Sequence, residues 1–137
     1  MGLIHTLARL ALAWVFVHGG QDVFRHPEPR AKTGGPFVDS LRGFVPFLPE
    51  DTIVLVRANA GLMVVAGTLL ALGKVPRLAA VVLAASLVPT TLAGHRFWTI
   101  QEPQPRAQQV IHVNKNMAML GGLLLYALTS GQPRRRR

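Results

Sequence analysis

Two groups of polar residues in this sequence have a spacing that lets their side chains act together. Each group is a histidine followed three and four residues later by polar side chains: His18, Gln21 and Asp22, and then His112, Lys115 and Asn116. Residues at this spacing share one face of a helix. Imidazole, amide and ammonium groups supply hydrogen-bond donors and titratable protons. Such a set suits the head group of a quinone, because its carbonyls accept hydrogen bonds and its reduction takes up protons.

Both groups lie at the ends of apolar blocks. The sequence has four such blocks, at residues 3–24, 53–72, 78–94 and 110–128. Each approaches the roughly 20 residues that a helix needs to cross a bilayer. If four spans alternate in direction, the polar ends of all four come to the same side of the membrane. We therefore predict an all-α fold, a four-helix transmembrane bundle running up-down-up-down in one domain over residues 1–130, with a basic tail at residues 131–137.

The polar ends of the second and third blocks add further candidates to one site. The predicted ligand-binding residues are His18, Gln21, Asp22, Arg57, Asn59, His95, Trp98, His112, Lys115 and Asn116. Charged and amide groups near hydrocarbon are costly unless they are paired or hydrated, so their clustering indicates a functional site. The alternative interpretation is that they anchor the helices at the interface, with an ion pair from Asp22 to Lys115 or Arg57 fixing the helix register. No catalytic residue is identified.

Composition limits the chemistry of the chain. It contains no cysteine, which excludes disulfides, thiolate metal sites and thiol redox cycles carried by the chain itself. His18, His95 and His112 lie at similar depth, but their spacing is not specific for haem, and we expect none. Asp22 is the only acidic residue in the blocks and no HExxH motif is present, so we expect no metal site.

The basic residues indicate how the chain meets the membrane. The formal net charge is +9 while half of the residues are hydrophobic, so anionic lipid is a better counter-charge than nucleic acid. Lys74, Arg77 and the arginines of the tail lie in short segments beside span ends, which favours cytoplasmic termini. The polar ends and the loop at residues 25–52 would then face the extracytoplasmic side. Arg9 is expected to reach the cytoplasmic surface with its long side chain.

Local patterns add four structural expectations. In the loop, Pro36 precedes apolar residues at near-helical spacing, Phe37, Leu41, Phe44 and Leu48. They predict a short amphipathic segment in the headgroup zone, ended by Pro46, or alternatively an ordinary loop. The Gly19-Gly20 pair predicts that the first helix loosens there.

In the second block, the small residues Ala60 and Gly67 share a face that should pack inward, opposite Leu62 and Val65. In the third block, Pro89 removes a backbone donor and should kink the helix, and Thr90 and Thr91 can bond the freed carbonyls.

Several stretches taken together indicate a family. They are residues 9–12, His18-Gly19, residues 67–70 with Gly73, residues 95–98 and residues 115–122. On these stretches the chain resembles the DoxX family of small four-helix membrane proteins. The resemblance implies a bacterial plasma-membrane subunit linked to respiratory or sulfur redox chemistry, since relatives are named as small subunits of quinol oxidase or thiosulfate:quinone oxidoreductase. The glutamate that the family often has on its second helix is absent, because Met63 stands at the corresponding position.

We therefore predict an accessory subunit of a membrane redox complex that contacts quinone through the polar cluster at the extracytoplasmic leaflet. Its expected partners are the lipid bilayer and other membrane or redox subunits, and no cofactor is expected to be covalently bound. Whether the chain is itself an enzyme stays open, with a non-catalytic subunit of a quinone-linked oxidoreductase as one answer. The alternatives are a structural or scaffolding membrane protein without a ligand, and a small transporter.

Overall fold

The structure, a computed structural model, describes residues 2–130 and is entirely helical over that range. Its elements in chain order are α1 (Leu3–Arg25), α2 (Glu28–Arg42), α3 (Thr52–Leu72), α4 (Pro76–Gly94), the 3-10 helix η1 (Phe97–Thr99) and α5 (Pro103–Thr129). The predicted all-α class is confirmed. The basic tail at residues 131–137 lies outside the described residues.

Three helical segments of the described chain are long and apolar enough to cross a membrane: Leu3–Arg25, Thr52–Leu72 and Pro76–Thr99. The fourth predicted span corresponds to α5. This helix has 27 residues, but its first half is rich in glutamine and charged side chains, so α5 does not meet the same standard of hydropathy.

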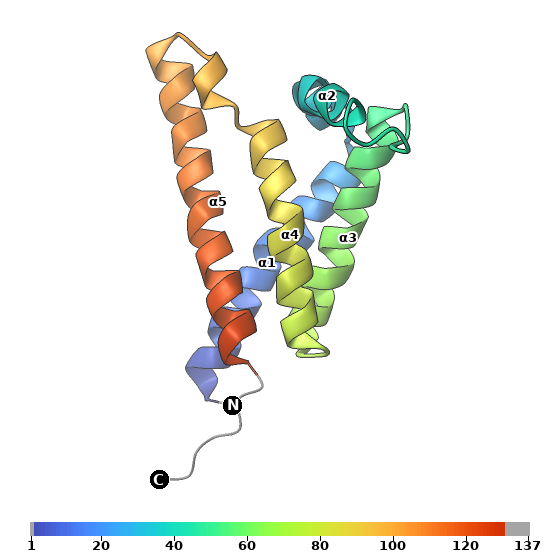
Figure 1. The fold of residues 1–137 in the computed structure, drawn as a ribbon. Coiled ribbons are helices and arrows are strands. Elements are labelled where there is room, and N and C mark those ends of the chain that lie inside the picture. Colours follow the sequence, from blue (N-terminus) through green and yellow to red (C-terminus); the bar gives the residue numbers. More distant parts are fainter. Residues whose placement is uncertain (1, 131–137) are drawn as a thin grey trace.

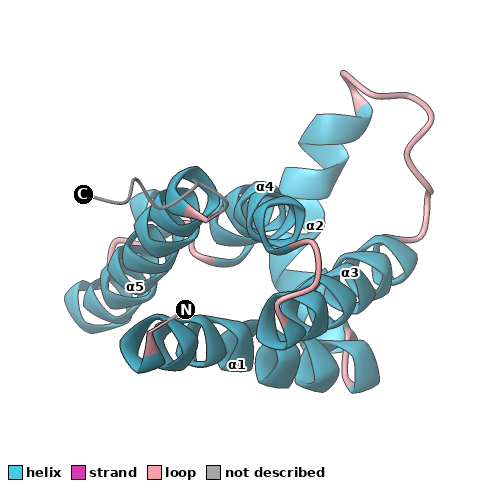
Figure 2. Ribbon diagram, turned by 90° about the horizontal axis from the view of Figure 1, so that it is seen from below, coloured by secondary structure: helices cyan, strands magenta, loops and turns pink. Residues whose placement is uncertain are grey.

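The four long helices run lengthwise through the molecule, and α2 lies across one end (Figure 1). We call the end that carries α2 and the α4–α5 connection the upper end. The lower end carries the start of α1, the turn between α3 and α4, and the end of α5. Seen from below, α1 and α3 lie side by side and face α4 and α5 (Figure 2). α1 packs chiefly on α3, and α5 on α4, whereas α1 and α5 touch only slightly.

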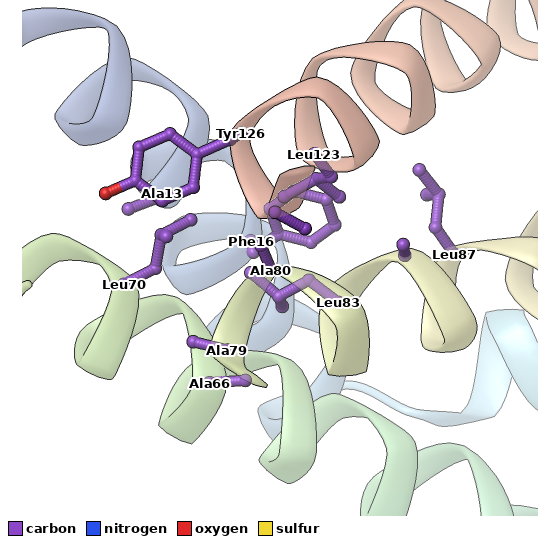
Figure 3. Close-up of a cluster of buried hydrophobic side chains, with 12 residues drawn as sticks. Ala13, Phe16, Ala66, Leu70, Ala79, Ala80, Leu83, Leu87, Leu123 and Tyr126 are labelled. Carbon is purple, nitrogen blue, oxygen red and sulfur yellow. The ribbon is translucent and has the colours of Figure 1, made fainter. Parts of the chain in front are cut away.

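The hydrophobic core lies toward the lower end. Phe16, Leu70, Leu83 and Leu123 come from four different helices and are fully buried in one cluster (Figure 3). Alanines of α4 and α3 complete it, which lets the helix axes approach closely. In lipid, where area burial gives no drive for association, such close packing is the main source of helix contact.

Two glycines bring α1 and α3 together. A Cβ at Gly20 would lie 2.9 Å from Val64 Cγ2 and 3.0 Å from the carbonyl oxygen of Ala60, and a Cβ at Gly67 would lie 2.9 Å from Val17 Cγ2. Gly20 is buried and α1 continues without a break to Arg25. The prediction that the glycine pair loosens α1 is therefore wrong, because Gly20 is a contact point rather than a flexible one.

The predicted inward and outward faces of α3 hold for most of its length. Ala60 and Gly67 are buried, while Leu62 and Val65 are exposed. On α4, Thr90 Oγ1 donates to the carbonyl of Ser86 at 2.8 Å, and Thr91 Oγ1 donates to that of Leu87 at 2.7 Å. These bonds go to residues 86 and 87, and not to the carbonyl of Ala85, which lacks its helical donor because Pro89 has no N–H.

The helix in the loop differs from the prediction. α2 spans Glu28–Arg42, so Pro36 lies inside it rather than at its start, and Phe44 and Leu48 follow it. Pro29 provides the favoured proline of the first turn instead. Local spacing could not reveal this start, because α2 is held by its packing on α3 and α4.

Arg42 ties the end of α2 to the start of α3. Its guanidinium donates to the carbonyls of Pro49 and Glu50 and to Thr52 Oγ1, and it pairs with Asp39. The side chain of Asp51 caps α3 by accepting from the backbone of Ile53 at 2.8 Å. The nine residues between the two helices are therefore fixed by one arginine and one cap.

The glycine contact gives a stability prediction with a control in the adjacent residue. Gly20→Ala should lower the free energy of unfolding by about 1–3 kcal/mol, because the new methyl group overpacks against α3. Gly19→Ala meets nothing within 4 Å and should instead be neutral or stabilising by up to about 1 kcal/mol. Denaturant titration of the purified protein in detergent micelles measures both. Equal effects of the two substitutions would show that Gly20 does not set the distance between α1 and α3.

Candidate functional site

A partly open cavity of about 530 Å³ lies in the upper half of the molecule. Its walls come from α1, α2, α3, α4 and α5, and α2 contributes Phe37 and Leu41 across the top. Its size falls within the roughly 300–1,000 Å³ that is typical of small-molecule sites. The lining is mostly apolar, with Phe16 and Met63 among its larger side chains.

Six polar residues line this cavity. Five of them lie one on each of the five α-helices, and the sixth, His95, follows the last residue of α4. They are Asp22, Arg30, Asn59, Thr90, His95 and Asn116. Four of the ten predicted site residues are in this set: Asp22, Asn59, His95 and Asn116. An apolar chamber with a few convergent polar groups is the usual form of a site for a lipophilic ligand.

Asn59 belongs to a hydrogen-bonded network between α3 and α4. Its Nδ2 donates to Thr90 Oγ1 at 3.0 Å, and its Oδ1 accepts from Ser86 Oγ at 2.9 Å. On the opposite side of α4, Asn116 Nδ2 donates to Thr91 Oγ1 at 2.8 Å. The two threonines that follow Pro89 therefore link α4 to α3 and to α5, close to the cavity wall.

The two histidines at the upper end of α4 and α5 form a stacked pair. The ring centroids of His95 and His112 are 4.8 Å apart and the rings are almost parallel. His95 Nδ1 also lies 2.7 Å from Gln109 Oε1, which fixes the orientation of the ring. Lys115 and Arg30 bring further positive charge near His112. This corner of the site is thus electropositive, and Asp22 is the only carboxylate on the cavity wall.

The other predicted site residues lie outside this cavity. His18 is exposed and stacks on Trp14, with ring centroids 5.3 Å apart. Trp98 is exposed and meets Phe97 edge to face. Gln21 borders a second, smaller hollow of about 290 Å³ between α1 and α3. Although His18 and Asp22 are four residues apart on α1, Asp22 lines the cavity and His18 does not.

The predicted ion pair of Asp22 is absent. Over residues 2–130 one ion pair is present, between Arg42 and Asp39. Arg57 instead donates from Nε to the carbonyl of Phe24 at 3.3 Å, and Lys115 is exposed. The pair with Lys115 assumed that the upper ends of α1 and α5 meet, whereas these two helices barely touch. The pair with Arg57 does not form because that guanidinium bonds to the backbone of α1 instead.

Sequence reasoning missed four polar residues of the site region: Arg30, Ser86, Thr90 and Gln109. Ser86 and Thr90 are four residues apart inside an apolar block, which is a signal that could have identified them. Arg30 could not be placed before the start of α2 was known. Within the described range, no three histidine, cysteine or acidic side chains gather as they would around a metal ion.

Comparison with known proteins places the chain in a family. The model of the DoxX family matches residues 4–96, which is more than half of the sequence. The chain belongs to the DoxX family. No curated protein and no solved structure matches it.

The match places this DoxX protein among integral membrane proteins, in agreement with its three apolar candidate spans. It includes His18, Gly67, Gly73 and His95 of the stretches that carry the resemblance, and it covers four of the five helical elements that line the cavity. Residues 115–122 and the whole of α5 lie beyond it.

Two double-mutant cycles compare the hydrogen bond between Asn59 and Ser86, which the structure contains, with the ion pair between Asp22 and Lys115, which it does not contain. Asn59→Ala and Ser86→Ala should couple by about 0.6 kcal/mol, with an upper bound near 1.7, as interhelical hydrogen bonds in membrane proteins do. Asp22→Ala and Lys115→Ala should show coupling within about 0.3–0.5 kcal/mol of zero, the scatter expected of independent sites.

Unfolding free energies of the four single and two double variants, measured in one detergent, give both values. A coupling above 1 kcal/mol between Asp22 and Lys115 would mean that the two helices approach each other at the upper end, contrary to the structure.

Proposed function

We propose that this DoxX protein is a four-helix transmembrane bundle that serves as an accessory subunit of a membrane redox complex and holds a quinone head group in its upper cavity. The observation that carries the proposal is the cavity itself, an apolar chamber with hydrogen-bonding groups from separate helices on its wall.

The fourth span of this proposal is the second half of α5. Leu123 and Tyr126 are buried in the core, while Leu124 and Leu125 are exposed, as expected of a helix with one face on the bundle and one on lipid. Successive long helices also alternate in direction along the chain (Figure 1). The concentration of Lys74 and Arg77 at the lower end favours the cytoplasm for that end.

The polar groups of the cavity fit a quinone in kind. The second Nδ2–H of Asn116 can donate to a carbonyl oxygen. His95 Nδ1 donates to Gln109 Oε1, so its Nε2 can accept from a quinol hydroxyl, and Asp22 can accept a proton released when a quinol is oxidised. The chain has no cysteine, so electrons must come from a cofactor or a partner protein. For that reason we assign the chain the role of a non-catalytic subunit that positions a quinone for its partner.

A second candidate function rests on the network of Asn59. Both ends of that amide are already bonded within the bundle, to Thr90 and Ser86. Such bonds join helices without any ligand. A structural or scaffolding membrane protein is therefore the competing proposal, and ligand binding decides between the two. Among residues 2–130, the apolar cluster of Phe16, Leu83 and Leu123 lies below the cavity, which does not favour the continuous polar path that a transporter would need.

Quinone binding can be tested by filling the cavity. Gly19 lines the cavity and has no atom within 4 Å of its Cβ position, so Gly19→Leu should occupy space without displacing α3. Decylubiquinone at a hundredfold excess over its Kd should stabilise the wild-type protein by about 2.7 kcal/mol, and this shift should be lost in Gly19→Leu. Gly121→Leu is the matched control, because Gly121 is exposed, equally open and not among the residues that line the cavity.

Thermal unfolding in detergent, with and without decylubiquinone, provides the measurement. If the wild-type protein shows no shift, or if both leucine variants keep it, the cavity does not bind quinone and the scaffolding role is favoured.

The proposed orientation can be tested by labelling, since a chain without cysteine gives no background. Phe47→Cys and Gln104→Cys should react with a membrane-impermeant maleimide in intact cells, because both residues are exposed at the upper end. Lys74→Cys and Thr129→Cys should react only after the membrane is permeabilised. Labelling of Gln104→Cys and Thr129→Cys from the same side would mean that α5 does not cross the membrane.

A further inference from the structure

The lower end of the molecule holds cations that have no carboxylate near them. Arg9 lies on α1, Lys74 in the turn between α3 and α4, and Arg77 at the start of α4. All six acidic residues of the chain lie at the upper end, on α1 after Gln21, on α2 or in the upper loops. No aspartate or glutamate side chain is therefore available at the lower end to neutralise Arg9, Lys74 and Arg77.

Three buried polar atoms at this end have no hydrogen-bond partner among the described residues: His5 Nδ1, Arg9 Nε and Tyr126 Oη. His5 and Arg9 lie one turn apart on α1, and the ring centroid of His5 is 5.1 Å from that of Tyr126. We call these three residues the basal cluster. Tyr126 is 7% exposed, and its hydroxyl points away from the hydrophobic core (Figure 3).

The members of the basal cluster share the ability to donate. The arginine Nε–H and the tyrosine hydroxyl are donors, and His5 Nδ1 donates in one tautomer. Buried polar groups are rarely left unpaired, so three unpartnered atoms, each able to donate, are consistent with an acceptor supplied from outside the described residues. An anion with several oxygens satisfies all of them, and arginine is especially suited to phosphate.

The surrounding backbone leaves room for the guanidinium. Gly73 is left-handed, with φ of 69°, and a Cβ at that position would overlap Arg9 Nη1. Arg9 donates no hydrogen bond to the end of α3 that it covers. Its side chain reaches the turn at the lower end, in the direction that was expected, and is half-buried there. Arg77, in contrast, is engaged through Nε, which donates to the carbonyl of Ala127 at 3.0 Å.

We propose that the basal cluster binds the phosphate of an anionic phospholipid, with Lys74 and Arg77 adding positive charge around it. A lipid is the source of this phosphate because the cluster adjoins an apolar outer surface: Ile4, Leu7 and Leu125 are all exposed next to it. The backbone of Arg9 lies about 9 Å inside its span, at 1.5 Å per residue, but its guanidinium packs against Gly73 just after the end of α3, which is headgroup depth. The lipid is thus held by its phosphate at the cluster and by its acyl chains along α1 and α5.

The test uses the full chain in detergent, titrated with dioctanoyl phosphatidylglycerol, with dioctanoyl phosphatidylcholine and inorganic phosphate as separate probes. The anionic lipid should bind saturably and the other two should not. Arg9→Gln should raise its Kd by about tenfold or more, and Tyr126→Phe, which removes one oxygen, by about three- to tenfold. Arg106→Gln is the matched control, because Arg106 is exposed at the opposite end and should leave the Kd unchanged.

Each contrary result overturns the proposal in a different way. Equal weakening by Arg106→Gln would mean that the lipid responds only to overall charge. Comparable binding of inorganic phosphate would assign the cluster to a soluble anion instead of a lipid. If Arg9→Gln and Tyr126→Phe lower the melting temperature without changing the Kd, the cluster is part of the bundle packing and binds no lipid. Loss of quinone binding would not bear on this result, since the two sites lie at opposite ends.

Discussion

The architecture depends on the close contact of α1 with α3 at Gly20 and Gly67. Because neither residue has a side chain, the two helices approach until Val17 and Val64 meet backbone. This contact aligns α1 with α3 rather than with α5, and α5 then packs on α4. The two pairs converge at Phe16, Leu83 and Leu123 in the lower half. They separate above it, and the cavity occupies the space that α2 closes from the top.

The two halves of the molecule differ in how their polar groups are satisfied. In the upper half, the amides of Asn59 and Asn116 are bonded to threonines of α4, and Arg42 is fully engaged with the loop that follows α2. In the lower half, the hydroxyl of Tyr126 and the Nε of Arg9 are left without partners. The buried polar groups of the upper end thus find partners within the bundle, whereas those of the lower end need partners from its surroundings.

Much of the fold could be predicted from the sequence, because three of the four apolar blocks coincide with α1, α3 and α4 to within a few residues. Periodicity also identified the packed face of α3. It could not predict that Pro36 lies inside α2, since that helix depends on contacts with α3 and α4. The site was predicted less well. Asp22, Asn59, His95 and Asn116 meet at the cavity, but His18 and Lys115 turn away, because the pairing of α1 with α3 is decided by glycines rather than by charge.

The tether formed by Arg42 has a consequence for how the cavity is reached. The guanidinium of Arg42 bonds the end of α2 to the start of α3. The two residues His26 and Pro27 join the start of α2 directly to the end of α1, so both ends of α2, which closes the cavity from the top, are fixed. For the proposed ligand, the weak contact between α1 and α5 would make the side of the bundle the route of entry. A lipophilic molecule would then arrive from within the bilayer, and occupancy would follow its mole fraction in the membrane instead of its concentration in water.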